Sequence, residues 1–305
     1  MVSGSNVDNT VKTKAKTANT YFERIDRVIG RMNEQIEQSL SLEDLAAIAG
    51  VSAFHFHRLY RAMTGETPSG TLRRLRLARA AGLLRDSASP VTEIAFEAGY
   101  ESSQAFSKAF RRETGCSASE LRRDPERLNT VIRKLSSPPE RPSRNVLEVR
   151  VVSVEPFKVI ASRHMGPQSG LFDAYGALFR WGEATGHAQK LRGIYGVPVD
   201  DPGTVEETEC RFDCCFDFGN DVTPGSDYGE LMLGGGLYAV TRHVGQYEGL
   251  LEKSDFLYGT WLPVSDYVLR DVPSYNHYLA DPDSLPPEEW ETDVYIPVEK
   301  ALSAC

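Results

Sequence analysis

Two internal repeats, one in each half of the chain, constrain the fold more than any other feature of the sequence. Residues 56–65 align with residues 106–115 at a constant offset of 50. In the second half, residues 163–166 align with residues 242–245 at an offset of 79. Similarity at a fixed offset indicates duplicated structural units. We therefore expect a multi-domain chain in which each domain is built from two related units.

A proline-rich segment separates the two halves. Residues 136–143 contain three prolines within five residues, and proline interrupts both helices and strand pairing. The charge changes at the same place: residues 21–134 carry 18 basic and 15 acidic side chains, whereas residues 135–305 carry 13 and 27. A basic half joined to an acidic half predicts a nucleic-acid partner for the first half and a different task for the second.

The first 20 residues are polar and lack the apolar core of a secretory signal. No run in the sequence approaches the roughly 18 apolar residues that a membrane span needs. We expect a disordered leader over residues 1–20, a cytoplasmic location and no membrane partner.

Three of the five cysteines lie close together in the second half, at Cys210, Cys214 and Cys215. This spacing is compatible with a thiol or metal site. Apolar and charged residues alternate through residues 210–218, however, and alternation favours a half-buried strand with Cys210 and Cys214 on its core face. We expect no metal site and no cofactor.

Residues 41–65 form the first of two predicted helix-turn-helix units. Ser41 followed by Asp44 is typical of a capping box, and Gly50 is typical of a helix end. The second helix, over residues 52–65, has two faces. Its apolar face is expected in the core and carries Phe56, Leu59, Tyr60 and Met63. Its other face carries Phe54, His57, Arg58 and Arg61 at the same helical spacing.

The second unit repeats this arrangement after a long connecting helix that begins near Pro68. Phe106 and Phe110 are expected in the core. The outward face carries Gln104, Ser107, Lys108 and Arg111, with Arg112 nearby. A helix that packs on one side and presents hydrogen-bond donors on the other suits the major groove of DNA. For the first unit taken alone, a solvated face with an incidental phenylalanine is the alternative.

These segments carry a family resemblance. Residues 21–127 resemble the DNA-binding domain of the AraC/XylS family through residues 41–46, 93–102 and 106–115. The resemblance implies an all-α domain in which a long helix bridges two recognition helices that enter successive major grooves of double-stranded DNA. The family usually has a proline two or three residues after Gly115, where this chain has Ser117, Ala118 and Ser119.

The family positions that reach DNA can be carried over residue by residue. In the first unit the resemblance implies base contacts from Phe54, His57 and Arg58. In the second unit it implies base contacts from Ser103, Gln104, Ser107 and Lys108. Phosphate contacts are expected from Arg61, Arg111 and Arg112. Residues 128–145 are then expected to form a linker.

The second half, residues 146–300, has the pattern of an α+β domain. Strands are expected at residues 146–153, 157–164, 208–218, 237–244, 272–279 and 292–298. Helices are expected at residues 169–186 and 248–265. This half resembles the GyrI-like effector-binding domain, through residues 238–247, 261–263, 278–282, 286–289 and 293–298. The resemblance implies a duplicated domain with a cleft that binds a small-molecule effector.

Aromatic residues are concentrated in this half and supply most of the candidate ligand contacts. The candidates are Tyr175, Trp181, Tyr195, Trp261, Asn276 and Tyr278. Rings in an acidic domain suit an apolar or cationic organic ligand. The family often has glutamate where Asn276 stands, and an amide supplies no counter-charge to a buried cation. Neutral and amphipathic ligands therefore stay open.

Two further functions are compatible with the second half. The acidic domain is compatible with binding of a protein partner, and RNA polymerase is a candidate for the whole chain. Some GyrI-like modules resemble hydrolases of small electrophiles, for which His164, His243 and Glu248 are the candidate residues here. The repeated His-x-Gly is more simply a turn, so we expect a regulator and not an enzyme.

Overall fold

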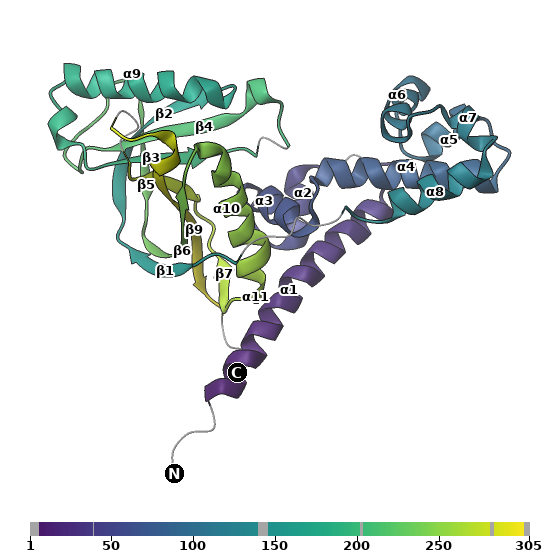
Figure 1. Ribbon diagram of the computed structural model, residues 1–305, viewed down its shortest axis with the longest axis horizontal. Helices are drawn as coiled ribbons and strands as arrows, with labels where there is room; N and C mark the ends of the chain where they lie inside the picture. Colours follow the sequence, from purple (N-terminus) through teal and green to yellow (C-terminus); the bar gives the residue numbers. More distant parts are fainter. Residues whose placement is uncertain (1–5, 39, 140–145, 202–203, 281–283, 302–305) are drawn as a thin grey trace, which may run out of the picture. The chain divides into compact units, whose positions relative to one another are not determined.

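The computed structural model describes residues 6–38, 40–139, 146–201, 204–280 and 284–301, with side chains described from Thr20 onward (Figure 1). The chain divides into two compact units. One unit consists of Met1–Phe22, Val51–Met63 and Ser143–Cys305, and the other consists of Glu23–Gly50 and Thr64–Pro142. Within the described residues, no helix combines the length and apolar character that crossing a membrane requires.

Eight helices precede the first described strand: α1 (Asn6–Glu34), α2 (Leu42–Ala49), α3 (Ala53–Thr64), α4 (Pro68–Asp86), α5 (Val91–Glu97), α6 (Ser103–Thr114), α7 (Ala118–Arg122) and α8 (Pro125–Ser136). Their ends follow the predicted signals. The Ser41 hydroxyl accepts a hydrogen bond from the Asp44 backbone N–H, and Gly50 ends α2 in the left-handed conformation at φ 65°. Pro68 opens α4 at its first position, where the missing N–H is tolerated.

The second helix-turn-helix unit, α5 and α6, packs on α4 and α8 through a shared hydrophobic core. Phe106 and Phe110 from α6 are fully buried there. Leu77 from α4 and Ile94 from α5 join them in the same cluster. Ser117 forms a capping box with Glu120 at the start of α7. A side-chain cap therefore provides the helix entry that proline usually provides in the family that this region resembles.

The expected linker at 128–145 begins too early. Helix α8 continues to Ser136, because the Asp124 carboxylate caps it and Pro125 occupies its first position. Leu128 and Leu135 are buried in the core of the helical unit, so this segment belongs to that unit. The remainder of the expected linker includes residues 140–145, which lie outside the described residues.

The expected leader also differs from the structure, since α1 begins at Asn6. Residues 6–20 contain neither glycine nor proline. Once a helix is nucleated by the buried residues downstream, each additional turn costs little free energy. Residues 1–5 lie outside the described part of the chain.

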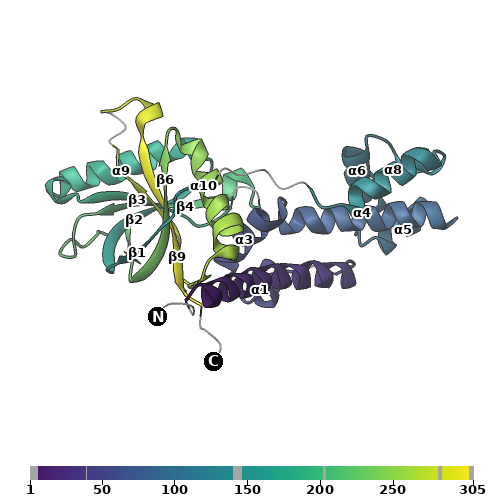
Figure 2. The same cartoon turned by 60° about the horizontal axis from the view of Figure 1, so that its bottom comes forward.

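The carboxy-terminal domain is a curled antiparallel sheet with two main helices. Its strands are β1 (Arg150–Val154), β2 (Phe157–Met165), β3 (Gly193–Pro198), β4 (Arg211–Asp217), β5 (Gly229–Leu233), β6 (Gly236–Val244), β7 (Tyr267–Leu269), β8 (Tyr275–Tyr278) and β9 (Glu291–Lys300). The order in the sheet is β1-β6-β9-β8-β3-β4-β2-β5, and β7 pairs separately with β9. Helix α9 (Leu171–Ala184) lies along β2 and β4, whereas α10 (Leu250–Phe256) lies against β6 and β9 (Figures 1 and 2).

The duplication extends through the whole domain. β1 and β5, β2 and β6, and the starts of α9 and α10 are each 79 residues apart. The first strands are exchanged between the halves, because β1 pairs with β6 and β5 pairs with β2. Each half therefore has one edge completed by a strand from the other half.

Two cores follow from the alternation of side chains along the strands. Val159 and Ala161 of β2 point into a core that includes Tyr238 and Val240 of β6. Ile160, between them, points to the opposite face, where α9 covers the sheet. Strand β4 is buried on both faces, so Cys214 and Cys215 are both inaccessible. Burial of Cys214 is therefore as expected, whereas the expectation for Cys210 is wrong, since Cys210 precedes the strand and is half-buried.

Strands β3, β5 and β7 were not predicted. β3 contains Gly193 and Gly196, which weaken strand patterns and are typical of turns. A Cβ atom at Gly196 would lie 2.5 Å from the Phe212 ring and 2.8 Å from the Tyr278 hydroxyl, so close strand packing requires glycine there. The helix expected at 248–265 is interrupted, because a π-helical turn at Leu257–Trp261 separates α10 from α11 (Leu262–Val264).

The repeated His-x-Gly sequences form equivalent turns after β2 and β6. His164 Nε2 lies 2.9 Å from the Pro167 carbonyl oxygen, and His243 Nε2 lies 2.7 Å from that of Gln246. A Cβ atom at Gly249 would overlap the His243 ring. The glycine and the imidazole thus pack as one unit.

We predict that Gly249→Ala destabilises the carboxy-terminal domain by about 1–3 kcal/mol, because the added methyl group displaces His243 from its hydrogen bond. All three tryptophans lie in this domain, so denaturant unfolding followed by tryptophan fluorescence measures its stability selectively. Gly225→Ala is the matched control, since a Cβ atom there meets nothing within 4 Å. Equal midpoints for the two variants would contradict the packing argument.

Candidate DNA-binding and ligand-binding sites

The outward face of α6 is exposed as predicted. Gln104, Ser107, Lys108, Arg111 and Arg112 are all exposed, and Ser103 is partly exposed. The Ser102 hydroxyl accepts a hydrogen bond from the Ala105 backbone N–H at 3.2 Å and so fixes the start of the helix. With its two phenylalanines buried beneath, α6 presents a rigid row of polar and basic side chains.

The equivalent face of α3 is covered. The predicted core residues Phe56, Leu59, Tyr60 and Met63 are fully buried. His57 and Arg58, expected on the outward face, are also buried, at only 4% exposure each. Phe54 and Arg61 are partly exposed. Helix α3 is therefore enclosed on both faces in this structure, unlike α6.

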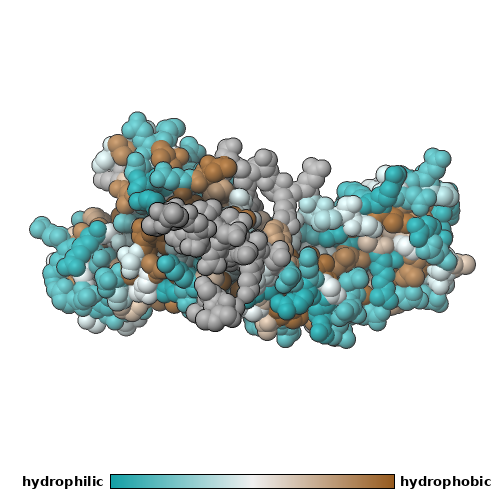
Figure 3. Space-filling view, turned by 90° about the horizontal axis from the view of Figure 1, so that it is seen from below, coloured by the Kyte–Doolittle hydropathy of each residue, from teal (hydrophilic) through white to brown (hydrophobic). Residues whose placement is uncertain are grey.

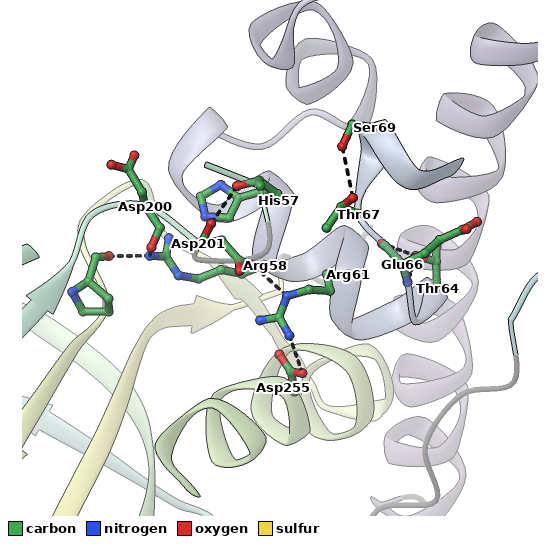
Figure 4. A network of polar contacts seen from close by, with 12 residues as sticks. His57, Arg58, Arg61, Thr64, Glu66, Thr67, Ser69, Asp200, Asp201 and Asp255 are labelled. Atoms are coloured by element: carbon green, nitrogen blue, oxygen red, sulfur yellow. Dashed lines mark hydrogen bonds and ion pairs between the residues drawn. The ribbon is translucent and has the colours of Figure 1, made fainter. Parts of the chain in front are cut away.

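Acidic and carbonyl groups of its own compact unit surround the basic side chains of α3 (Figure 4). Arg58 donates to the carbonyl oxygen of Pro198 and to that of Asp200, the latter at 3.2 Å. Arg61 forms two ion pairs, each at 2.7 Å, with the carboxylates of Asp201 and Asp255. Pro198 ends β3, whereas Asp255 lies on α10.

Arg58 is further held by its own helix. Its Nη1 donates to the Phe54 carbonyl oxygen at 2.6 Å, and its guanidinium carbon lies 4.3 Å from the centre of the Phe54 ring. A buried charge needs such partners to offset its lost hydration. Arg58 thus has three backbone carbonyl acceptors and an aromatic ring around it inside the protein.

His55 anchors α3 to the same unit, although it lies on neither predicted face. Its Nδ1 lies 2.8 Å from the Tyr258 hydroxyl, and its Nε2 lies 2.9 Å from the Val272 carbonyl oxygen. Burial, followed by the charge of Arg58, lowers the pKa of His55 to about 4. The only sequence signal was the run of rings at residues 54–57, where residues 104–107 of the second unit have a single phenylalanine.

Three of the six candidate ligand residues lie together. The Tyr175 hydroxyl donates to the Tyr195 carbonyl oxygen at 2.8 Å, and the rings of Tyr175 and Tyr278 meet edge to face at 5.9 Å. Asn276 is buried two residues before Tyr278 on β8. Tyr175, Asn276 and Tyr278 therefore form one polar, aromatic cluster at the centre of the sheet.

The other three candidates lie elsewhere. The Tyr195 ring points to the opposite sheet face, where it stacks on His277 at 4.4 Å. The remaining two are tryptophans packed in separate places: Trp181 lies against Phe218, and Trp261 stacks on Tyr267. These three residues pack against aromatic neighbours in separate places, so they do not join the cluster of Tyr175, Asn276 and Tyr278.

Two aromatic residues join the cluster that were not among the candidates. Tyr247 lies 5.2 Å from the Tyr278 ring and stacks on Trp290 at 4.7 Å. A hollow of about 410 Å³ is lined by sequence neighbours of these rings, namely Val244, Leu279, Ala280, Leu285, Glu289 and Glu291. Val244, Leu279 and Leu285 of this hollow are among the exposed large apolar side chains.

The surface visible in Figure 3 is mainly hydrophilic with separate hydrophobic patches.

The candidate thiol Cys214 is buried, and the candidate hydrolase residues His164 and His243 each stabilise a turn. Burial raises the pKa of the Cys214 thiol to about 12, which disfavours the reactive thiolate. The described side chains contain no cluster of three histidine, cysteine or acidic residues that could hold a metal ion. His164 and His243 hold turns through backbone carbonyls, and Glu248 is exposed.

Comparison with known proteins identifies both halves. Residues 147–299 match the GyrI-like small molecule binding domain, and residues 45–124 match a helix-turn-helix domain. The chain is 29% identical over 155 residues to the probable transcriptional regulator YgiV of Escherichia coli, covering 50% of this chain and 96% of that protein. It is 26% identical over 266 residues to the right origin-binding protein of Escherichia coli, covering 82% and 88%. It is also 40% identical over 99 residues to the transcriptional activator RclR of Escherichia coli, covering 32% and 35%.

The buried histidines of α3 generate a prediction for its pH dependence. Burial, followed by the charge of Arg58, also lowers the pKa of His57 to about 4. An imidazole whose pKa is about 6.5 when unfolded and 4 when folded stabilises the folded state fully above pH 6.5. This contribution is lost as the pH falls through 4. We expect the imidazole NMR signals of His55 and His57 to stay in the neutral form down to about pH 5, with His55→Phe assigning the resonances. Titration of both near pH 6.5 would contradict the burial of α3.

Proposed function

Because this chain belongs to the GyrI-like family of small-molecule-binding domains and carries an AraC-type helix-turn-helix domain before it, we propose that it is a ligand-responsive transcription regulator that reads a specific double-stranded DNA sequence. The observation that carries the proposal is the exposed row of polar and basic side chains on α6. The row recurs at an offset of 50 on α3, so two reading helices are built from one pattern.

The two helices have different roles in this proposal. Arg58 of α3 reads a guanine through its two-pronged guanidinium, with Phe54 and His57 contacting neighbouring bases. The shorter side chains Ser103, Gln104 and Ser107 of α6 fix the register with fewer base contacts, and Lys108 makes the main base contact of this helix. Arg61, Arg111 and Arg112 neutralise phosphates.

Substitutions on α6 separate base reading from charge. We expect Lys108→Ala to weaken binding to the preferred duplex by about 1–3 kcal/mol and to relax sequence choice. Arg111→Ala should weaken all duplexes alike and reduce the salt dependence of binding by about one charge. Selection from a random duplex library, followed by anisotropy titration at several salt concentrations, measures both effects. Unchanged sequence preference in Lys108→Ala would remove α6 from base reading.

We assign the ligand to the aromatic cluster of the carboxy-terminal domain. Tyr175, Tyr247, Tyr278 and Trp290 offer ring faces and edges, and a hollow lined by apolar and acidic sequence neighbours of these residues offers further contacts. Asn276 supplies an amide and no charge, so a neutral or amphipathic aromatic molecule fits better than one that needs a buried counter-charge.

Tryptophan fluorescence tests this assignment, because Trp290 belongs to the cluster and Trp181 does not. A thermal-shift screen of the full chain against neutral, amphipathic and cationic aromatic compounds supplies the probe. We expect the compound that gives the largest thermal shift to change the tryptophan fluorescence of the wild-type chain and of the Trp181→Phe variant. Trp290→Phe should lose most of the change. Loss of the response in Trp181→Phe alone would place the ligand elsewhere.

A further inference from the structure

The matched helices α3 and α6 differ in what covers them. Position by position, Arg58 and Arg61 of α3 correspond to Lys108 and Arg111 of α6 at the offset of 50. The α6 pair is exposed. In the α3 pair, Arg58 is 4% exposed and the Arg61 side chain 14%, because groups of the carboxy-terminal domain cover them within one compact unit.

We propose that Pro198, Asp200, Asp201 and Asp255 form an internal binding surface for the DNA-reading face of α3 and hold the regulator in a closed state. These four residues make up the acidic surface, which competes with DNA for the same side chains of α3. The inference rests on the proposed function, since α3 must be a reading helix for the competition to matter.

The chemistry of the acidic surface imitates that of DNA. Arg61 lies between two carboxylates at 2.7 Å each, as it would beside phosphate oxygens. Arg58 donates to two carbonyl oxygens, as it would to the acceptor edge of guanine. The same donor atoms cannot serve both partners, so the closed state and base reading by α3 exclude each other.

The closed contact also leaves polar groups of α3 unsatisfied. His57 Nε2 and Arg61 Nη2 are buried without a hydrogen-bond partner among the described residues. Native proteins rarely leave buried polar atoms unpaired. These two atoms make the closed contact less favourable than a fully paired one, and DNA would supply partners for them.

The acidic surface is tested by removing its charge in the full chain. The variant Asp201→Asn/Asp255→Asn loses both partners of Arg61, whereas Asp221→Asn/Glu230→Gln loses two charges of the same domain that pair with Lys190 and Lys158. The probe is a duplex enriched from a random library by a mixture of the wild-type chain and the Asp201/Asp255 variant. Its dissociation constant is measured by anisotropy at one salt concentration, and hydrogen exchange reports on residues 51–63.

We expect the Asp201/Asp255 variant to bind the duplex about tenfold more tightly, which corresponds to a reading-competent fraction of about one tenth in the wild-type chain. Hydrogen exchange in residues 51–63 should be faster in this variant. The control should match the wild-type chain within about twofold in both measurements.

Three results would overturn the inference, and they differ in what they say of the proposed function. If residues 51–63 are released but the duplex binds no more tightly, the closed state is wrong and DNA binding stands. If the control tightens binding equally, general charge is the cause and not the acidic surface. If no duplex is enriched, both the proposed function and the closed state fail. If the double variant no longer unfolds cooperatively, as followed by tryptophan fluorescence, the test is repeated with Asp255→Asn alone. The Asp255 side chain is 15% exposed, so this single change disturbs the fold less.

Discussion

The antiparallel pairing of β3 with β8 joins the two halves of the carboxy-terminal sheet, and both candidate surfaces of that domain depend on it. Three residue pairs define the register, with Tyr195 opposite His277 at its centre and Gly196 opposite Asn276 at one end. β8 carries Asn276 and Tyr278 of the aromatic cluster, whereas β3 ends at Pro198, whose carbonyl accepts Arg58. A shift between these two strands would therefore move the aromatic cluster and an α3 contact together.

Helices α3 and α6 show how one sequence pattern supports two environments. Both bury two aromatic side chains at matched positions, Phe56 and Tyr60 in one and Phe106 and Phe110 in the other. Their opposite faces differ in polarity, because α3 has Phe54 and His57 where α6 has Gln104 and Ser107. The more aromatic face tolerates burial, and the more polar face remains in water.

Sequence periodicity predicted the helical caps, the buried phenylalanines and the exposed row of α6, because each of these depends on neighbours within a few residues. It did not predict the covering of α3, since the partners of Arg58 and Arg61 lie about 140 and 194 residues away. It also missed β3, where Gly196 is required by the approach of Phe212 and Tyr278 and not by a turn. Trp181 and Trp261 were grouped with the cluster wrongly, since each packs on an aromatic neighbour elsewhere, Phe218 and Tyr267 respectively.

The exchange of first strands has a consequence for how the carboxy-terminal domain acquires its structure. β1 leaves the ribosome well before β6, the strand with which it pairs. β2 likewise leaves it well before its partner β5. Long-range pairing of this kind slows folding and leaves strand edges unpaired for a time. The helical unit lies within residues 23–142 and can form during synthesis, whereas the carboxy-terminal domain must await nearly its entire length. Chaperone demand during synthesis should accordingly centre on the carboxy-terminal half.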